Sequence, residues 1–356
     1  MMVIECAGDG RERGRAHGQQ ARDLVRTALD RWREGTSTRS RRHLASTGLL
    51  AAVEAAVPDL AEEMRGIAEA TAVPFAEILA YNFMDEQWWV HREHLELGCS
   101  VLGRAHPEGV FLAQNMDLPD FMDGSQIVLR IRPEAGPEAL VLSSAGMIGL
   151  TGINAASVGV CVNTLGMLRH NSAGLPVAAA IRGALAHSSR DRAVDFLHRI
   201  SHASGQHYAV ADTRGFHGVE CSAAAVVVSC PAGSPLLLHT NHPLANSDLD
   251  PDAERELERR GRITDSRVRL AFLETHPVCD RGAAERLLAD RTAPLCVTPR
   301  QGRRTLTFGA VAFEFGTTPP AARFCLGLPD RQSWIEPGWH SPPHPVTGDR
   351  PPAGGE

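Results

Sequence analysis

The residues Leu97-Gly98-Cys99-Ser100 combine a nucleophilic side chain with a glycine directly before it. Glycine lets the backbone adopt conformations that a Cβ atom would forbid, so the thiol of Cys99 can lie against a distorted peptide bond. Such a thiol could accept the Gly98 acyl group from its own nitrogen. Hydrolysis of that thioester would release Cys99 as a new N-terminal residue. Its free α-amino group, with a pKa of about 7.7–8.0, would then serve as a base for the thiol.

The alternative interpretation is that Cys99 is an inert buried thiol. The chain has eight cysteines, with no CxxC pair and no repeated spacing. This pattern argues against a disulfide framework or a zinc knuckle, and we expect most of these cysteines to fill space in the core. The chemistry of Cys99 therefore depends on which groups the fold places around it.

The first part of the chain, to about residue 97, is predicted to be helical. Apolar residues recur at helical spacing in 16–33 and in 49–70. The second stretch contains Pro58 followed by acidic residues, which is typical of the start of a helix. Near the end of this part lie Asp85 and Glu86. Because adjacent helix positions point apart, we do not expect these two carboxyl groups to act as a pair.

Short strand-like runs replace the helices near Cys99, and turn signals separate them. The order along the chain is helices, strands, two helices, strands, helices, strands, which favours two antiparallel sheets between helices over a parallel βαβ sheet. After Cys99, two helices are expected around Val177 and Val194, and further helices are expected over about 251–275 and 281–289. The expected strands are 100–102, 110–114, 126–131, 140–144, a strand–turn–strand over 152–165, 207–211, 218–222, 225–229, 236–239, 306–314 and 323–328.

Composition excludes several functional classes. The 356 residues are 43% hydrophobic and 22% charged, with a formal net charge of −6 and no basic stripe suited to nucleic acid. There is no GxGxxG or GxxxxGK[ST] motif and no run of 18 apolar residues, and the N-terminus lacks a secretory apolar region. We therefore expect a soluble, cytoplasmic protein without nucleic-acid or membrane partners, metal or cofactor.

The motifs, taken together, resemble the acyl-coenzyme A:6-aminopenicillanic acid acyltransferases and their bacterial relatives. These are N-terminal-nucleophile hydrolases that are also classed as a cysteine peptidase family, because they cut themselves. The resemblance covers about residues 8–315, and each motif alone is weak, but their common order is specific. The motifs are Arg13-Gly14-Arg15-Ala16-His17-Gly18, the helix start from Pro58 to Glu69, Gly98-Cys99-Ser100, Ala113-Gln114-Asn115-Met116-Asp117 for the family's GQNxD, Gly149 to Asn154, Gly159 to Asn163, His239-Thr240-Asn241-His242 and Asp265-Ser266-Arg267.

The resemblance implies an α+β fold: a four-layer αββα sandwich with two antiparallel sheets. It also implies a helical α segment at 1–98 and a catalytic β segment at 99–340. The five prolines and three glycines after residue 340 predict a disordered tail at 341–356. The two fragments released by cutting at Gly98–Cys99 would stay associated. The enzyme would act on a small amide or peptide-like metabolite of secondary metabolism through an acyl-Cys99 thioester. Water as acceptor makes it an amidohydrolase; an amine acceptor with acyl-coenzyme A as co-substrate makes it an N-acyltransferase.

The resemblance also assigns site residues. Cys99 would be the nucleophile, and Asp117, 18 residues later, would orient the freed amine. Asn241 would stabilise the oxyanion, with Asn163 as a second candidate donor. Arg267 would hold the thiolate form and pair with Asp117. The alternatives are a turn residue before a proline for Asp117, a strand-end hydrogen bond for Asn163 and an exposed helix charge for Arg267.

Two regions depart from the family pattern. Residues Phe324 to Pro329 differ from the usual ending, and Val-Thr follows Cys296 where relatives often have Arg-His. Because these regions would shape the pocket, the resemblance does not identify penicillin as the substrate. The alternative function is a catalytically inactive member that acts as a binding or carrier protein in a biosynthetic pathway. In that case the Gly98–Cys99 bond would stay intact.

Overall fold

Two β-sheets form the centre of the protein. The computed structural model describes residues 3–38, 47–91, 98–107, 109–299 and 304–340. The larger sheet has the strand order β1-β4-β5-β6-β7-β8-β9-β10, and the smaller has the order β11-β2-β3-β12-β13. The strands are β1 (Val3–Gly8), β2 (Gly98–His106), β3 (Gly109–Pro119), β4 (Gln126–Pro133), β5 (Ala139–Ser144), β6 (Thr151–Asn154), β7 (Gly159–Thr164), β8 (Gln206–Asp212), β9 (Gly215–Cys221), β10 (Val226–Cys230), β11 (Leu236–His239), β12 (Thr305–Glu314) and β13 (Ala321–Cys325).

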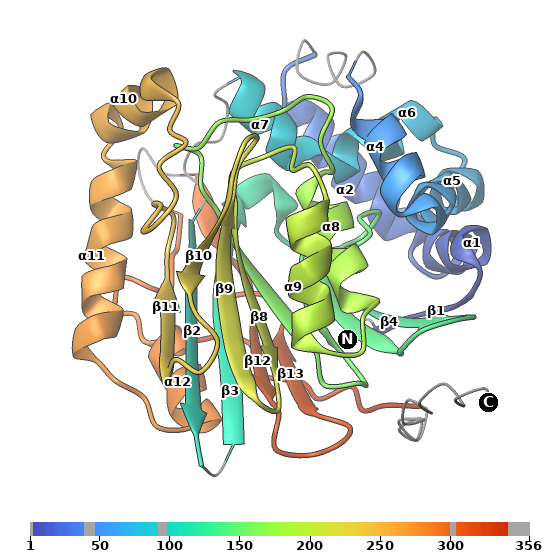
Figure 1. Cartoon of the computed structure of the whole chain (residues 1–356). Helices are drawn as coiled ribbons and strands as arrows, with labels where there is room; N and C mark the ends of the chain where they lie inside the picture. Colours follow the sequence, from blue (N-terminus) through green and yellow to red (C-terminus); the bar gives the residue numbers. More distant parts are fainter. Residues whose placement is uncertain (1–2, 39–46, 92–97, 108, 300–303, 341–356) are drawn as a thin grey trace, which may run out of the picture.

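Helices cover the outer face of each sheet, so the layers run helix, sheet, sheet, helix (Figure 1). The smaller sheet is covered by the helices from the later part of the chain: α10 (Pro251–Arg259), α11 (Arg262–Thr275) and α12 (Arg281–Ala289). The larger sheet is covered by α8 (Val177–Leu185), α9 (Arg190–Arg199) and the helices that precede Cys99. These are α1 (Gly10–Gln20), α2 (Arg22–Gly35), α4 (Leu49–Ala56), α5 (Pro58–Thr71), α6 (Phe75–Asn82) and α7 (Met84–His91).

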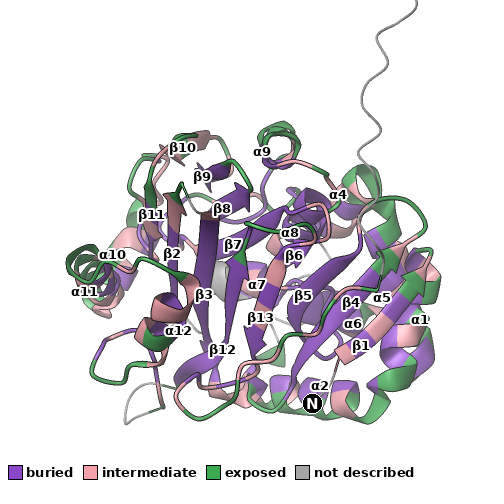
Figure 2. Cartoon of the chain, turned by 90° about the horizontal axis from the view of Figure 1, so that it is seen from below, coloured by how far each residue is buried: buried purple, intermediate pink, exposed green. Residues whose placement is uncertain are grey.

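Alternating side chains divide the core between these layers. Leu140 and Leu142 of β5 pack between the two sheets, whereas the intervening Val141 packs against the helices. In the smaller sheet, Val101 points toward the other sheet and Leu102 points toward α11 and α12. The strands of both sheets are accordingly buried along most of their length, as Figure 2 shows. The predicted αββα sandwich is confirmed.

The strand pattern after Cys99 also agrees with the sequence, but two expectations were wrong. The first part of the chain is not entirely helical, because it begins with β1. This strand pairs in parallel with β4, from Val3 opposite Val128 to Gly8 opposite Pro133. The larger sheet is therefore mixed, although its other pairs are antiparallel. The tail predicted at 341–356 lies outside the described residues.

The RGRAHG motif near the N-terminus joins layers and does not line the site. Gly14 lies so close to α5 that a Cβ atom there would be 1.9 Å from the main-chain oxygen of Glu63. Arg13 of α1 donates to the buried carboxylate of Glu63 at 3.0 Å, and Arg182 of α8 donates to the same group at 2.8 and 2.9 Å. His17 accepts a 3.0 Å hydrogen bond from the main-chain N–H of Gly146. The motif thus anchors the N-terminal helices to the larger sheet.

Candidate active site

Cys99 lies near the start of β2, an inner strand of the smaller sheet, and its side chain is 5% exposed. Antiparallel pairing with β3 sets Cys99 opposite Met116 and Gly98 opposite Asp117. A Cβ atom on Gly98 would lie 2.6 Å from Asp117 Oδ2, so only glycine permits this close approach. The GQNxD-like motif and the cysteine are therefore neighbours because of strand register.

The carboxyl group of Asp117 is fully buried beside the Gly98–Cys99 bond. Thr307 of β12 donates a 2.7 Å hydrogen bond to its Oδ1 atom, and Thr307 itself receives one from the N–H of Val297. The carboxyl group is therefore held in place by a neighbouring strand and does not act as a turn residue. Its Oδ2 atom is the one that faces Gly98.

The main chain of Cys99 is fixed by two asparagines. Its N–H donates to Oδ1 of Asn241 at 2.7 Å, and its carbonyl accepts from Nδ2 of Asn163 at 3.2 Å. Nδ2 of Asn241 donates to the carbonyl of Thr164 at 3.1 Å. Nδ2 of Asn163 also donates to the carbonyl of His239 at 3.4 Å. Both N–H donors of Asn163 are thus occupied, and its geometry fits holding the backbone of Cys99 better than the predicted donation to an oxyanion.

The predicted arginine is replaced by its neighbour two positions later. Arg267 is exposed on α11, so its assignment to the site was wrong. Arg269 is 1% exposed, and its Nη1 donates to the carbonyl of Cys99 at 2.7 Å. Its Nη2 donates to Oδ1 of Asn241 at 2.9 Å, and its Nε faces Asp265 at 3.3 Å. Helix geometry explains the difference, because residues two positions apart are rotated by about 200° around the helix axis and so face nearly opposite sides.

The intact chain keeps the thiol protonated. Burial is the main cause, and together with the negative charge of Asp117 it raises the pKa of the Cys99 thiol to about 12. The cation of Arg269 opposes this increase only in part. A thiol in this setting is a weak nucleophile until a base removes its proton.

Asn163 is oriented by a buried polar chain that the sequence did not reveal. Its Oδ1 contacts Nδ1 of His207 at 2.9 Å, and the His207 ring stacks on His239 with 3.7 Å between centroids. Burial keeps the pKa of His207 well below its usual range, so the ring is neutral. His239 Nε2 in turn lies 2.7 Å from Oε1 of the buried Glu220. Three residues on separate strands, β8, β9 and β11, thus support one amide.

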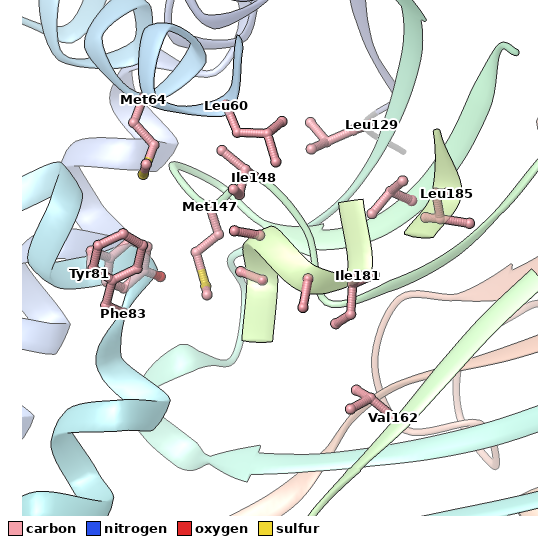
Figure 3. Packing of buried hydrophobic residues seen from close by; sticks show 14 of the residues in the cluster. Leu60, Met64, Tyr81, Phe83, Leu129, Met147, Ile148, Val162, Ile181 and Leu185 are labelled. Atoms are coloured by element: carbon pink, nitrogen blue, oxygen red, sulfur yellow. The ribbon is translucent and has the colours of Figure 1, made fainter. Parts of the chain in front are cut away.

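A mostly apolar pocket of about 530 Å³, including its open mouth, borders Cys99. Asp117 and Cys99 lie in its wall, together with Asp85 and Gln206. The apolar lining is Met84, Met116, Leu118, Met147, Leu150, Val162, Val177, Ala178 and Ile181. Figure 3 includes Met147, Val162 and Ile181 among the packed side chains of the core.

Asp85 and Glu86 belong to one network, although they are linked through Gln206 and Ser204 and not directly. Gln206 donates to Asp85 at 2.7 Å and to Ser204 at 3.1 Å, and Ser204 donates to Glu86 at 3.0 Å. Burial raises the pKa of Asp85 to about 6. Burial, with the charge of Asp85 as a second cause, raises the pKa of Glu86 to about 7. The link depends on β8 and its preceding loop, about 120 residues away, and is invisible in the local helix pattern.

The described residues show neither a metal-binding cluster nor a membrane-spanning helix. No group of three or more His, Cys, Asp or Glu residues within the described ranges is arranged to hold a metal ion. In the same part of the chain, no helix combines the length and the apolar character needed to cross a bilayer.

Comparison with known proteins yields one family and several relatives. The model of the family "Acyl-coenzyme A:6-aminopenicillanic acid acyl-transferase" matches residues 104–329, which include Asp117, Asn163, Asn241 and Arg269 and begin after Cys99. The acyl-coenzyme A:6-aminopenicillanic-acid-acyltransferase 40 kDa form of Emericella nidulans is 27% identical over 254 residues, covering 69% of this chain and 70% of that protein.

Two solved structures are among the matches. Penicillin V acylase from Agrobacterium tumefaciens has a TM-score of 0.42 at 14% identity, over 67% of this chain and 86% of its own. A variant of conjugated bile acid hydrolase from Clostridium perfringens has a TM-score of 0.42 at 11% identity, over 67% of this chain and 92% of its own. The family model spans more than half of the 356 residues, and the chain therefore belongs to the acyl-coenzyme A:6-aminopenicillanic acid acyl-transferase family.

Proposed function

We propose that this family member is an autoprocessed cysteine enzyme that transfers an acyl group from an amide to water or to an amine, through an acyl-Cys99 thioester. One observation carries the proposal. The residue that the sequence singled out as nucleophile has its N–H held by Asn241, its carbonyl held by Asn163 and Arg269, and a pocket in front of it. Such fixed geometry is what an acyl-transfer site requires.

Self-cleavage would begin with attack of the Cys99 sulfur on the Gly98 carbonyl carbon. The C–N bond breaks, the thiol proton passes to the departing nitrogen, and Gly98 becomes a thioester of Cys99. Water then hydrolyses the thioester and leaves a Gly98 carboxylate and a free Cys99 amine. Asp117 supports this step by its position against Gly98, where its carboxylate can orient the new ammonium group.

Turnover would repeat the same chemistry on a substrate. The free amine, beside Oδ1 of Asn241, takes the thiol proton and later gives it to the leaving amine. The sulfur attacks the substrate carbonyl, and the acyl group remains on Cys99 until water or an amine removes it. Nδ2 of Asn241 lies toward Thr164, a pocket-lining residue, so it is the candidate donor to the oxyanion.

The absence of lysine from the sequence makes self-cleavage simple to measure. The intact chain carries a single amine, at its N-terminus, and cleavage at Gly98–Cys99 creates a second. Exhaustive amine acylation under denaturing conditions should therefore add one label before cleavage and two after it, on fragments 1–98 and 99–356. A cyanobenzothiazole probe, which condenses with an N-terminal cysteine, should label only fragment 99–356.

The variant Cys99→Ala should lose both cleavage and turnover. Cys161→Ala is the matched control, because Cys161 is another buried thiol and packs between the sheets, outside the pocket lining. That control should cleave and turn over normally. Turnover by the uncut chain, or by Cys99→Ala, would refute the proposal, and a chain that stays uncut and inactive would favour the binding-protein alternative.

A further inference from the structure

The polar end of the pocket is rich in hydrogen-bond acceptors and poor in donors. We define the acceptor cluster as Asp85, Glu86 and Gln206. Because a carboxylate can only accept, the amide N–H₂ of Gln206 faces Asp85, and its Oε1 atom is directed elsewhere. Within the described residues, Oε1 of the fully buried Gln206 and Oε2 of Glu86, which is 4% exposed, have no hydrogen-bond partner. Asp85 itself lines the pocket and is partly exposed.

No cation of the chain neutralises this cluster in the part that the structure describes, because Asp85 and Glu86 form none of the ion pairs found there. Both Asp85 oxygens accept only from neutral groups, at 2.7 Å from Gln206 and 3.4 Å from Thr164. Two other buried carboxylates have more or stronger hydrogen-bond partners. Glu63 accepts from two arginines, and Glu220 contacts His239 and accepts from three main-chain N–H groups. Glu86 accepts from the main-chain N–H of Val177 at 2.8 Å and from Ser204, and a buried carboxylate without a cation is costly.

We propose that the acceptor cluster binds a protonated amine on the acyl group of the substrate, so that the enzyme selects amides whose acyl chain ends in an ammonium group. This inference rests on the proposed function, because it treats the pocket as the acyl pocket of Cys99. An ammonium group has three N–H donors, and the two oxygens of Asp85 in the pocket wall are acceptors for them, with the unpartnered Oε1 of Gln206 on the neighbouring lining residue. The apolar lining between Cys99 and the cluster suits the methylene stem.

The electrostatics of the pocket also favour an ammonium group as the bound group. Burial raises the pKa values of Asp85 and Glu86, so the empty pocket resists a full negative charge. A bound cation would favour the charged form of Asp85. An anionic acyl chain would meet the carboxyl group of Asp85 in the pocket wall, so it should be excluded.

Three coumarin amides test the proposal directly, because they differ only at the end of the acyl chain. The 5-aminopentanoyl amide carries the ammonium group, the hexanoyl amide replaces it with methyl, and the glutaryl amide carries a carboxylate. We expect kcat/KM to favour the ammonium over the methyl compound by about 10- to 100-fold, as for a charge-assisted hydrogen bond, and to be lowest for the carboxylate.

The variant Asp85→Asn keeps the shape of the side chain and removes its charge. It should bring the ammonium-to-methyl ratio close to one, mainly through a raised KM for the ammonium compound. The control Asp195→Asn removes an exposed carboxylate from α9 and should keep the wild-type ratio. An equal loss of kcat on all three amides would overturn the proposal, because Asp85 would then act in the reaction and not in selection.

Binding separates this inference from the proposed function. The full chain of Cys99→Ala, which retains the pocket of the uncut protein, is titrated calorimetrically with 5-aminopentanamide and with hexanamide. Preferential binding of the ammonium compound, lost in Cys99→Ala/Asp85→Asn, supports the inference even if wild-type protein neither cleaves nor turns over. Equal binding of both amides refutes it, even if self-cleavage and hydrolysis occur as proposed.

Discussion

Nη1 of Arg269 donates a 2.7 Å hydrogen bond to the carbonyl oxygen of Cys99, 170 positions earlier in the chain. The same guanidinium donates to Asn241, so one buried side chain fixes both the main chain of Cys99 and the group that holds its nitrogen. Planar, forked donors of this kind are specific to arginine.

We expect Arg269→Lys to slow self-cleavage and turnover by about 100-fold or more, the usual loss when a fixed donor is removed from a reacting centre. The matched control is Arg267→Lys on the same helix, which changes an exposed side chain and should have no effect. Cleavage is followed by intact mass and turnover by amide hydrolysis. Equal effects of the two variants would contradict the placement of Arg269.

Gly98→Ala should block or strongly slow self-cleavage, because the added Cβ would lie 2.6 Å from Asp117 Oδ2 and displace the carboxyl group or the peptide. Gly103→Ala in the same strand is the control. Its Cβ would meet the end of the Leu112 side chain at 3.1 Å, which a small movement relieves. A time course of intact mass at constant temperature measures the two rates. Cleavage of Gly98→Ala at the wild-type rate would show that the approach of Asp117 is unimportant.

Glu63→Gln should destabilise the fold by about 3–5 kcal/mol, because it leaves the buried Arg13 and Arg182 without their carboxylate. Glu69→Gln is the control on the same helix, since Glu69 also pairs with two arginines, Arg11 and Arg15, but on the surface. Glu69→Gln should lower the free energy of unfolding much less than Glu63→Gln does. Urea unfolding of Cys99→Ala backgrounds, which contain a single uncut chain, compares the two free energies of unfolding.

Acidification should destabilise the protein partly through His17. Burial lowers the pKa of His17 from 6.5 to about 4, so the unfolded chain binds a proton before the folded chain does. The stabilising contribution is complete above pH 6.5 and is lost as the pH falls toward 4, with a slope of about 1.4 kcal/mol per pH unit. His17→Gln keeps an acceptor for the N–H of Gly146. It should lower the pH dependence of the free energy of unfolding by the contribution of one proton.

The control for that experiment is His276→Gln, because His276 is exposed on the protein surface and solvated in both states. Unfolding by urea at a series of pH values between 4 and 7 gives the slopes. If His17→Gln has the same slope as the wild type, His17 is not neutral in the folded protein as described.

The sequence was sufficient for the layers because they depend on local patterns, whereas the role of Cys99 as nucleophile stays a prediction. Alternation and turn residues located the strands after Cys99, and β11 and α12 have the predicted bounds. The strand β1 was missed, since six residues at a chain end carry little periodic signal. The helix over 251–275 was predicted as continuous but breaks at Gly261, which has a φ of 70°.

The site was predictable only in part. Family motifs located Asp117, Asn163 and Asn241, but they placed the arginine at the wrong position of α11. The signal for Arg269 was present, because Ile263, Ser266 and Arg269 follow the spacing of one helix face. No such signal existed for Asp85, Gln206 and His207, whose contacts come from strands far along the chain.

The parallel pairing of β1 with β4 has a consequence for the lifetime of the processed enzyme. A cut after Gly98 would turn this ladder from a link within one polypeptide into a link between two. Departure of the first fragment would strip β4 of its partner and uncover a row of backbone donors and acceptors, which invites pairing with foreign chains. Degradation of either fragment would then destabilise the other, so the two fragments should have the same lifetime in the cell.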